Sequence, residues 1–485
     1  MLIDLPVVET LAPEDGAFMF RDESILGTRM LLMFVADSCR AAHEAALAVR
    51  AEIDRLNLIF NGRRPDSELF SLNAAVEFNA SPELFAVVTL AEYWRVQTGG
   101  AFNARLGRVI RSWRTASNTP HRDEVAALAQ AAQHSTLILE PTSRTIVRPD
   151  AIEFALDGIA KGWILDRAFA VACSMPGISG ALVDIGGDMR CSRTSPAGLG
   201  WPIDIADPSR PFDNSPSVAT VRLHDRAIAT SGRGVRDRVL ADKRYSPTLD
   251  PCTGWPIERN ISASVIASTA ADADALATAL LVLPADAGVA LAENHATAAR
   301  ITMANGEVAQ TSIAATHFTA IAAREKQVAT PEKWQEGWQA LATFTAPRRQ
   351  LIRDPLFRSP YMAMWITDLD NRPVRTLILI GKRADWQKDN FIWWSMNRAR
   401  TERLVSTRSM STSAAGVYNV FWDGVDDAGR LVNAGTYVLH VETSRERGKH
   451  TYRSLTLAFG KFQRFTEVLP PTEEGGGLKV SFDHY

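Results

Sequence analysis

Apolar residues along the chain follow two patterns, and the change from one to the other divides it into two regions. Up to about residue 320, three segments carry apolar residues at helical spacing, and short apolar segments lie between and after them. The segments with helical spacing predict amphipathic helices, and the short apolar segments predict buried strands. We therefore expect a mixed α/β region, with helices in residues 39–60, 81–100 and 121–133 and strands in residues 25–36, 180–188, 201–207, 217–225, 226–232 and 261–268.

After about residue 345 the pattern changes to strands joined by Asp, Asn and Gly turns. Residues 360–381, 416–444 and 451–460 show it most clearly, and it predicts an all-β sandwich. Trp422 is expected in the sandwich core, before a turn in residues 423–430. The predicted organisation is a first domain at 1–325, a linker at 326–346, a sandwich domain at 347–470 and a flexible tail at 471–485.

The composition is typical of a globular protein and gives no sign of a nucleic-acid partner. Of 485 residues, 22% are charged and 46% hydrophobic, and the net charge is −2. No apolar run reaches the roughly 18 residues of a membrane span. The start, MLIDLPVVETLAPEDGAF, lacks the basic and long apolar segments of a secretory signal. Four dispersed cysteines without a CxxC pair favour a reducing compartment, with two disulfides as the alternative. These features together predict a cytoplasmic protein.

The segment ADADALATALLVL, residues 271–283, has an apolar helix pattern that carries acids and a hydroxyl. Asp274 and Thr278 are four residues apart, so a helix places their oxygens on one face. Converging hard oxygens suit Mg²⁺, which takes few protein ligands and leaves positions for water and phosphate. A structural alternative is that acids near the helix start favour the helix dipole and Thr278 bonds back to a carbonyl. That alternative explains Asp272 well and Asp274 less well.

Two further segments combine glycines with groups suited to an anion. LDGIAKGWILD, residues 156–166, leads into a helix with Lys161 near its N-terminus, where backbone amides and an ammonium can bind phosphate. A plain loop-to-helix start is the alternative. IATSGRG, residues 228–234, offers Thr230 and Ser231 around glycines, again suited to phosphate.

Two other segments are turns with a possible chemical role. VDIGGDMR, residues 183–190, ends a strand in paired glycines, which permit either close backbone approach to a ligand or a tight turn. YSPTLDPCTGWP, residues 245–256, is a proline-bracketed turn whose Asp250 either caps the turn or acts chemically.

In this order, the segments resemble the ApbE family, the FAD:protein FMN transferases. The series also includes GTRM at 27–30, RPDSELFSLN at 64–73 and GGAFNARLG at 99–107, and it covers roughly residues 25–315. The resemblance implies an ApbE-like α/β (α+β) domain and an Mg²⁺-dependent enzyme. Such an enzyme moves FMN from FAD, through a phosphoester, onto a Thr or Ser of a target flavoprotein and releases AMP. The C-terminal region resembles the module of unknown function that commonly follows ApbE domains, and it looks like an Ig-like β-sandwich.

The resemblance also implies where the ligands lie. The family's Mg²⁺ ligands correspond to the side chains of Asp274 and Thr278 with the backbone oxygens of Gly158 and Ala277. The family's FAD contacts correspond to Met30, Arg63, Ala101, Phe102, Asn103, Lys161 and Leu249. The family's usual setting is the bacterial envelope, so an envelope or periplasmic location, with a true start upstream, is the alternative to the cytoplasm.

Two positions depart from the family pattern. Ala155 stands where the family usually has an acid, two residues before Asp157. Pro247 stands where the family has the histidine favoured as base for the acceptor hydroxyl, and proline accepts no proton. Asp250 is the available substitute, although shaping the turn suits it better. Two alternatives follow: an FAD-binding relative or FAD pyrophosphatase that has lost transfer, and an accessory or assembly protein that acts through its β-sandwich.

Overall fold

The chain forms two compact units in the computed structural model, and each is described by itself. The structure describes residues 9–12, 17–116, 118–196, 198–208, 217–232, 238–240, 243–320, 333–335, 337–345, 361–381, 386–400, 404, 409–410, 417–444, 450–459, 463–472 and 476–484. Described residues up to 320 belong to the first unit and those from 333 to the second. Within this part of the chain, no helix has the length and apolar character needed to cross a membrane.

A nine-stranded sheet forms the centre of the described first unit, and each neighbouring pair in it is antiparallel. An antiparallel sheet combined with helices makes this unit α+β, as predicted. In order across the sheet, the strands are β1 (Glu9–Ala12), β2 (Ala17–Ile25), β3 (Thr28–Ala36), β7 (Ile178–Ile185), β8 (Asp188–Cys191), β11 (Ala227–Gly232), β14 (Asn260–Ala267), β15 (Ala298–Met303) and β16 (Val308–Gln310).

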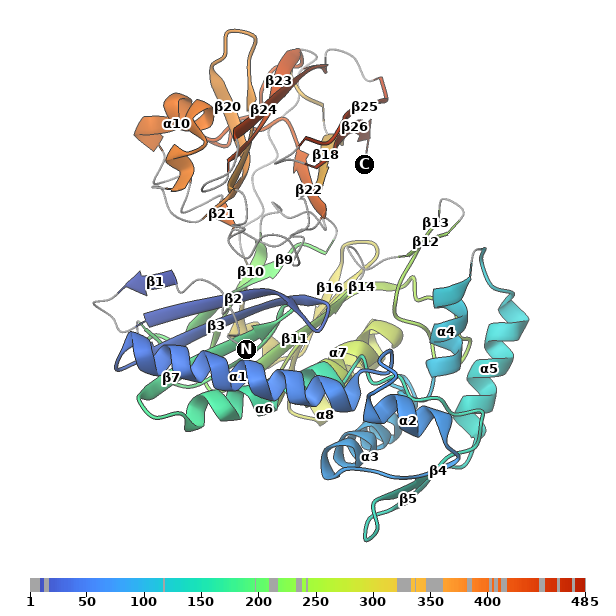
Figure 1. Cartoon of the computed structure of the whole chain (residues 1–485). Helices are drawn as coiled ribbons and strands as arrows, with labels where there is room; N and C mark the ends of the chain where they lie inside the picture. Colours follow the sequence, from blue (N-terminus) through green and yellow to red (C-terminus); the bar gives the residue numbers. More distant parts are fainter. Residues whose placement is uncertain are drawn as a thin grey trace. The chain divides into compact units, whose positions relative to one another are not determined.

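Helices cover one face of this sheet and a second, smaller sheet covers the other (Figure 1). Successive strand residues point to opposite faces, so Val183 lies in the helix-side core while its neighbour Leu182 lies in the other. The covering helices are α1 (Cys39–Phe60), α6 (Ala160–Ser174), α7 (Ala270–Val282) and α8 (Ala285–Asn294). The smaller sheet contains β17 (Phe318–Ala320), β10 (Ser217–Leu223) and β9 (Trp201–Ala206) in that order.

A helical subregion continues the first unit beyond the end of α1 (Figure 1). The predicted ends of its longest helix are confirmed, because the Ser81 hydroxyl accepts the Leu84 N–H at 3.2 Å and Gly99 and Gly100 follow with positive φ. The helices here are α2 (Glu68–Ala74), α3 (Pro82–Gln97), α4 (Gly107–Thr115) and α5 (Arg122–His134). The short strands here are β4 (Glu77–Asn79), β5 (Ile138–Glu140), β6 (Thr145–Val147), β12 (Arg238–Leu240) and β13 (Lys243–Tyr245). Outside this subregion, the short helix α9 (Ala314–His317) directly precedes β17 of the smaller sheet.

The second unit is a β-sandwich, as predicted, with a core built from both of its sheets. Trp422 is 1% exposed in that core, and its indole N–H donates to the Val425 carbonyl at 3.1 Å. One sheet contains β22 (Val417–Trp422), β18 (Trp338–Thr345), β26 (Leu478–His484) and β25 (Phe465–Leu469). The other contains β21 (Ser409–Met410), β20 (Pro373–Ile380), β19 (Tyr361–Thr367), β23 (Thr436–Ser444) and β24 (His450–Ala458), with α10 (Phe391–Asn397) beside it.

Two predicted boundaries in this unit are wrong. The predicted linker, 326–346, contains β18, which pairs with β22 and β26; residues 326–332 of that linker lie outside the described residues. The predicted flexible tail, 471–485, contains β26, which pairs with both β18 and β25. In β26, LKVSFDH alternates inward apolar and outward polar residues, and this period is that of a strand. In β18, alternate residues from Trp338 to Phe344 face the core.

Candidate functional site

Helices α6 and α7 cap each other's first turns. The Asp166 carboxylate of α6 accepts the backbone N–H groups of Ala270 (2.9 Å) and Ala271 (3.0 Å) at the start of α7. In return, Oδ2 of Asp274 on α7 accepts the backbone N–H of Gly162 (3.2 Å) in the first turn of α6. The first N–H groups of a helix have no partner within it, so each helix supplies the carboxylate that the other lacks. We call this arrangement the reciprocal cap.

Gly162 permits this contact because a larger residue does not fit there. A Cβ at Gly162 would lie 2.3 Å from the carbonyl oxygen of Ala270 and 2.7 Å from Cα of Ala271. Arg190 of β8 completes the junction by donating to Oδ1 of Asp166 at 2.6 Å. Burial raises the pKa of Asp166, while the two amide donors and Arg190 act in the opposite direction by favouring the carboxylate.

The α7 residues predicted as metal ligands lie at this junction. Asp274 is 3% exposed, and Thr278 follows it by one helical turn on the same face. Oγ1 of Thr278 lies 3.3 Å from Oγ of Ser231, at the end of β11. A Cβ at Gly158 would lie 3.1 Å from Oγ1 of Thr278. Ala277 is fully buried in mid-helix, where the helix ladder already uses one lone pair of its carbonyl oxygen.

Asp272 has the structural role expected of an acid near a helix start. Its Oδ1 accepts the indole N–H of Trp94 at 2.9 Å, and its backbone N–H donates to the hydroxyl of the N-cap residue Thr269 at 3.1 Å. These contacts tie α3 to α7 and distinguish Asp272 from Asp274, whose carboxylate faces the first turn of α6.

The oxygens of Gly158, Asp274 and Thr278 have the chemistry of a hard-cation site. The Gly162 N–H goes to Asp274, whereas a helix extended backwards would direct it to the Gly158 carbonyl. In the part of the chain that the structure describes, no three His, Cys, Asp or Glu side chains form a metal-binding group. One carboxylate with hydroxyl and carbonyl oxygens fits Mg²⁺, which keeps water and phosphate ligands, and does not fit a zinc site.

Lys161 lies between this junction and β11. Its ammonium forms an ion pair with Oδ2 of Asp188 on β8, and Oδ1 of Asp188 accepts the backbone N–H of Thr230 at 3.2 Å. Asp188 is 1% exposed, so a single buried carboxylate orients both the predicted phosphate-binding lysine and the end of β11, which carries Thr230 and Ser231. The sequence shows Asp188 only as the end of the VDIGGD segment, and nothing local in that segment identifies its partners.

The paired glycines after β7 form a tight turn. Gly186 and Gly187 have φ of 65° and 93°, values that favour glycine. The Gly187 N–H donates to Oδ1 of Asp184 at 2.8 Å. Burial raises the pKa of Asp184 to about 6, although this hydrogen bond and the charge of Arg29 lower it. The observed φ values and hydrogen bond therefore favour the tight-turn interpretation of this segment.

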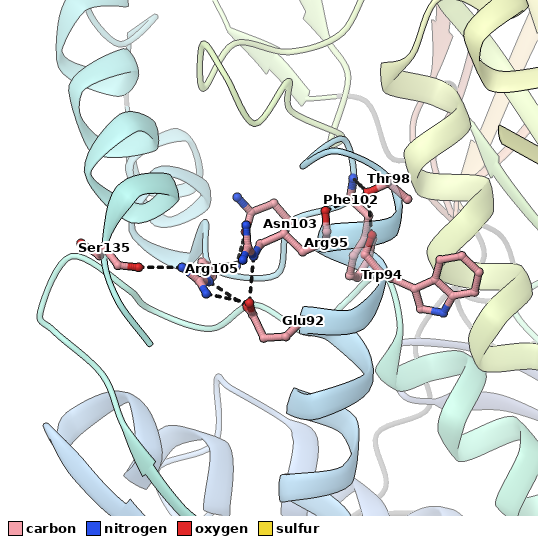
Figure 2. Close-up of polar contacts among 8 residues, drawn as sticks. All are labelled: Glu92, Trp94, Arg95, Thr98, Phe102, Asn103, Arg105 and Ser135. Atoms are coloured by element: carbon pink, nitrogen blue, oxygen red, sulfur yellow. Dashed lines mark hydrogen bonds and ion pairs between the residues drawn. The ribbon is translucent and has the colours of Figure 1, made fainter. Parts of the chain in front are cut away.

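The loop between α3 and α4 carries Phe102 and Asn103, and Phe102 borders the same junction. Figure 2 shows Asn103 beside Arg105 in this loop. The Thr98 hydroxyl accepts the Phe102 N–H at 3.0 Å. A Cβ at Gly158 would lie 3.3 Å from Cε2 of Phe102, so this ring borders the same glycine as Thr278. Nδ2 of Asn103 is buried and has no hydrogen-bond partner among the described residues. Ala101, which precedes Phe102, is 8% exposed.

Three other predicted FAD contacts have the following local settings. Met30 is buried in β3 opposite Ile185, Arg63 is exposed in the turn after α1, and Leu249 is buried in the cluster formed with α4 and α5.

The loop that carries Pro247 also carries Asp250, whose carboxylate accepts a backbone N–H. Oδ1 of Asp250 accepts the Cys252 N–H at 2.8 Å, and the Asp250 carbonyl accepts the Gly254 N–H at 2.8 Å. These bonds shape the turn, which is the role that suited Asp250 better. Pro247 itself is exposed, so a side chain at this position faces solvent.

Comparison with known proteins identifies the first unit. The ApbE family profile matches residues 26–301, which is more than half of the chain. The chain belongs to the ApbE family. A second profile, described as a predicted periplasmic protein (DUF2271), matches residues 350–474 of the sandwich unit. The predictions of family, fold and transferase class are thereby confirmed, and the description of the second profile favours a periplasmic location over the predicted cytoplasmic one.

Individual relatives agree with this assignment. The chain is 32% identical over 259 residues to the FAD:protein FMN transferase of Vibrio cholerae, covering 50% of this chain and 76% of that protein. It is 28% identical over 297 residues to the Treponema pallidum protein of the same name, covering 56% and 80%. Two solved structures share the fold. The ApbE protein of Thermotoga maritima has a TM-score of 0.57 at 24% sequence identity, and the flavin transferase ApbE of Vibrio cholerae has a TM-score of 0.54 at 25% sequence identity. Each match covers 62% of this chain and 99% of the matched chain.

Proposed function

We propose that this chain is an Mg²⁺-dependent FAD:protein FMN transferase that moves FMN onto a Thr or Ser hydroxyl of a target flavoprotein and releases AMP. The observation that carries the proposal is the reciprocal cap, which brings the N-terminus of α6, Lys161 and the oxygens of Asp274 and Thr278 to one junction. The names of the relatives, FAD:protein FMN transferase, support the choice of substrate and reaction.

The pyrophosphate of FAD fits the N-terminus of α6. A helix N-terminus carries a partial positive charge, which favours phosphate. Lys161 adds a full positive charge in the first turn, and Asp188 holds that ammonium towards β11. Thr230 and Ser231, at the end of β11, add hydroxyls.

Asp274 and Thr278, with the Gly158 carbonyl, would hold Mg²⁺ beside this pyrophosphate. When bound, the ion supplies neutralisation of phosphate charge and polarisation of phosphorus. The protein's own part is to keep these oxygens fixed. The Asp274 carboxylate is held by the Gly162 N–H, and the Thr278 hydroxyl by its helix and by Ser231.

In the transfer step, the acceptor hydroxyl oxygen forms a bond to the phosphorus of the FMN half of FAD. The bond from that phosphorus to the bridging oxygen breaks, and AMP leaves with the bridging oxygen. The hydroxyl proton must pass to a base. Pro247 cannot take it, and Oδ1 of Asp250 already accepts a backbone N–H.

The missing base at Pro247 is the reason to consider a second candidate function, FAD hydrolysis, in which the proton of the attacking water would pass to solvent. Water in place of the acceptor hydroxyl would give free FMN and AMP at the same junction. The observation that favours it is the exposed Pro247 at the position of the family's base.

One experiment separates these functions. The purified chain is incubated with FAD, Mg²⁺ and a candidate acceptor flavoprotein, and AMP release and covalent flavin fluorescence in a denaturing gel are followed together. Labelled acceptor with AMP supports transfer. AMP with free FMN and no labelled acceptor supports hydrolysis. FAD binding without either product contradicts both enzyme functions and favours an accessory role carried by the β-sandwich. We also propose a periplasmic setting, supported by the description of the second profile.

A further inference from the structure

A buried ion pair lies beneath the loop that carries Asn103 (Figure 2). Arg105 donates from Nε to Oε1 of Glu92 at 2.7 Å and from Nη2 to Oε2 at 2.6 Å. Its third nitrogen, Nη1, donates to the Ser135 carbonyl at 2.8 Å. The side chains of Arg105 and Glu92 are only 5% and 13% exposed. Two parallel bonds to a carboxylate fix the plane of a guanidinium, so Arg105 is held between α3 and the end of α5.

The same arginine holds the Asn103 amide through its backbone. The Arg105 N–H donates to Oδ1 of Asn103 at 3.0 Å. This bond identifies Oδ1 as the acceptor and turns the NH₂ group the other way. The orientation of Asn103 therefore follows from where the Glu92–Arg105 pair places the backbone of residue 105.

The Asn103 NH₂ group is a donor without an acceptor in the described structure. Nδ2 is buried, and no described residue bonds to it. Burying an unpaired donor is costly, and such a group is common where a ligand supplies the partner. The neighbouring Phe102 borders Gly158 at the junction of α6 and α7, so the unpaired donor stands in the loop that borders the proposed FAD site.

We propose that the buried Glu92–Arg105 pair is a positioning element for FAD, which fixes the Asn103 amide so that its NH₂ group donates to a neutral ring acceptor of the substrate. The acceptor is a carbonyl oxygen of the isoalloxazine or a ring nitrogen of the adenine. The inference rests on the proposed function, because it takes FAD as the ligand. Neither Glu92 nor Arg105 touches the substrate in this scheme.

The pair is charged at neutral pH, as this role requires. Burial by itself would raise the pKa of Glu92, but the hydrogen bonds and charges of Arg105 and Arg95 outweigh burial and lower that pKa. Arg95 contributes its own bond to Oε2 of Glu92 at 2.8 Å, so the carboxylate stays ionised and keeps both bonds to Arg105.

The test removes both charges together, because a single removal would leave an unpaired buried charge and destabilise the fold. FAD affinity is measured by flavin fluorescence for the full chain carrying Glu92→Gln and Arg105→Met. The expected result is an increase of about tenfold in the Kd for FAD, the size of one misplaced hydrogen bond. The matched control is Glu83→Gln, which removes an ion-pair carboxylate from the same helix, where Glu83 bonds to Arg55 at 2.9 Å; its Kd should equal that of the wild type.

A double-mutant cycle separates positioning from general damage. In an Asn103→Ala background, removal of the pair should cause no further loss of FAD affinity, since the pair acts through the missing amide. The same variants titrated with FMN and with ADP assign the acceptor to the isoalloxazine or the adenine half, according to which ligand loses affinity.

Two results would overturn the inference, and they differ in what else they overturn. Suppose that the wild-type chain binds FAD but removal of the pair leaves the Kd unchanged, or that removal weakens binding as much in the Asn103→Ala background as in the wild type. In either case the positioning role is wrong, while the proposed function stands. If the wild-type chain binds no FAD with or without Mg²⁺, the proposed function is wrong and the inference fails with it.

Discussion

Gly162→Ala tests the junction of α6 and α7 directly. The new Cβ would lie 2.3 Å from the Ala270 oxygen, whereas ordinary van der Waals contact begins at 3.4 Å, so the two backbones must separate by about 1 Å. That movement takes the 3.2 Å bond between the Gly162 N–H and Asp274 beyond hydrogen-bonding range. Overpacking costs about 1–3 kcal/mol and the lost cap about 1 kcal/mol, against a gain of roughly 0.5–1 kcal/mol from removing a helical glycine.

The predicted balance is a destabilisation of about 1–3 kcal/mol, which lowers the midpoint of thermal unfolding by several degrees. Far-UV circular dichroism in the helical band measures it, and AMP release from FAD should fall in parallel because Asp274 has moved. The matched control is Gly288→Ala in α8, where the new Cβ meets only the side-chain tips of Ile301 (2.9 Å) and Leu280 (3.2 Å) and a small change is expected. A Gly162→Ala protein that unfolds at or above the wild-type temperature, with AMP release intact, would refute the close contact between the helices.

Four further substitutions, one of them a control, test individual residues. Asp274→Ala should abolish Mg²⁺-dependent AMP release, and an active Asp274→Ala enzyme would exclude the metal assignment. The control is Asp272→Ala, which loses the Trp94 bond. This variant should lose about 1 kcal/mol of stability and keep its turnover. Pro247→His should increase covalent flavin on the acceptor relative to free FMN, and an unchanged ratio would place the base elsewhere. Burial raises the pKa of Asp184 from 3.8 to about 6, so the folded state binds more protons than the unfolded state between these values and loses stability as pH rises through them. Asp184→Asn should therefore raise the free energy of unfolding near neutral pH by at most about 3 kcal/mol, and raise it less near pH 4. Equal effects at both pH values would contradict the shifted pKa.

Local patterns predicted those parts of the site whose partners are close in sequence. The spacing of Asp274 and Thr278 is a property of one helix, and the order of the glycine-containing segments identified the family. Asp166, Asp188 and Arg105 were not predicted, because each acts on a residue whose position depends on the fold. Asp166 accepts from Ala270, 104 residues away, and no pattern around either residue reveals the bond.

The errors in the second unit have a similar cause. The segment WQALATFT has inward residues that include the small Ala340 and Ala342 between the bulky Trp338 and Phe344. A strand of this kind has a weak hydrophobic signal, and it becomes a sheet strand through its two neighbours, β22 and β26. β26 follows a segment rich in Pro, Glu and Gly, which indicated a flexible terminus. Pairing with β18 and β25 outweighs that local composition.

The reciprocal cap also makes the opening of the site cooperative. Because the first turn of each helix is completed by a carboxylate from the other, neither turn can loosen without releasing its counterpart. The amide hydrogens of Gly162, Ala270 and Ala271 should therefore exchange with solvent in a single opening event, at one common rate. The cap also joins segments synthesised more than 100 residues apart, so it forms late, as contacts of high sequence separation do. If the proposed function is right, a chain that ends before α7 lacks the completed α6 terminus at which the pyrophosphate would bind.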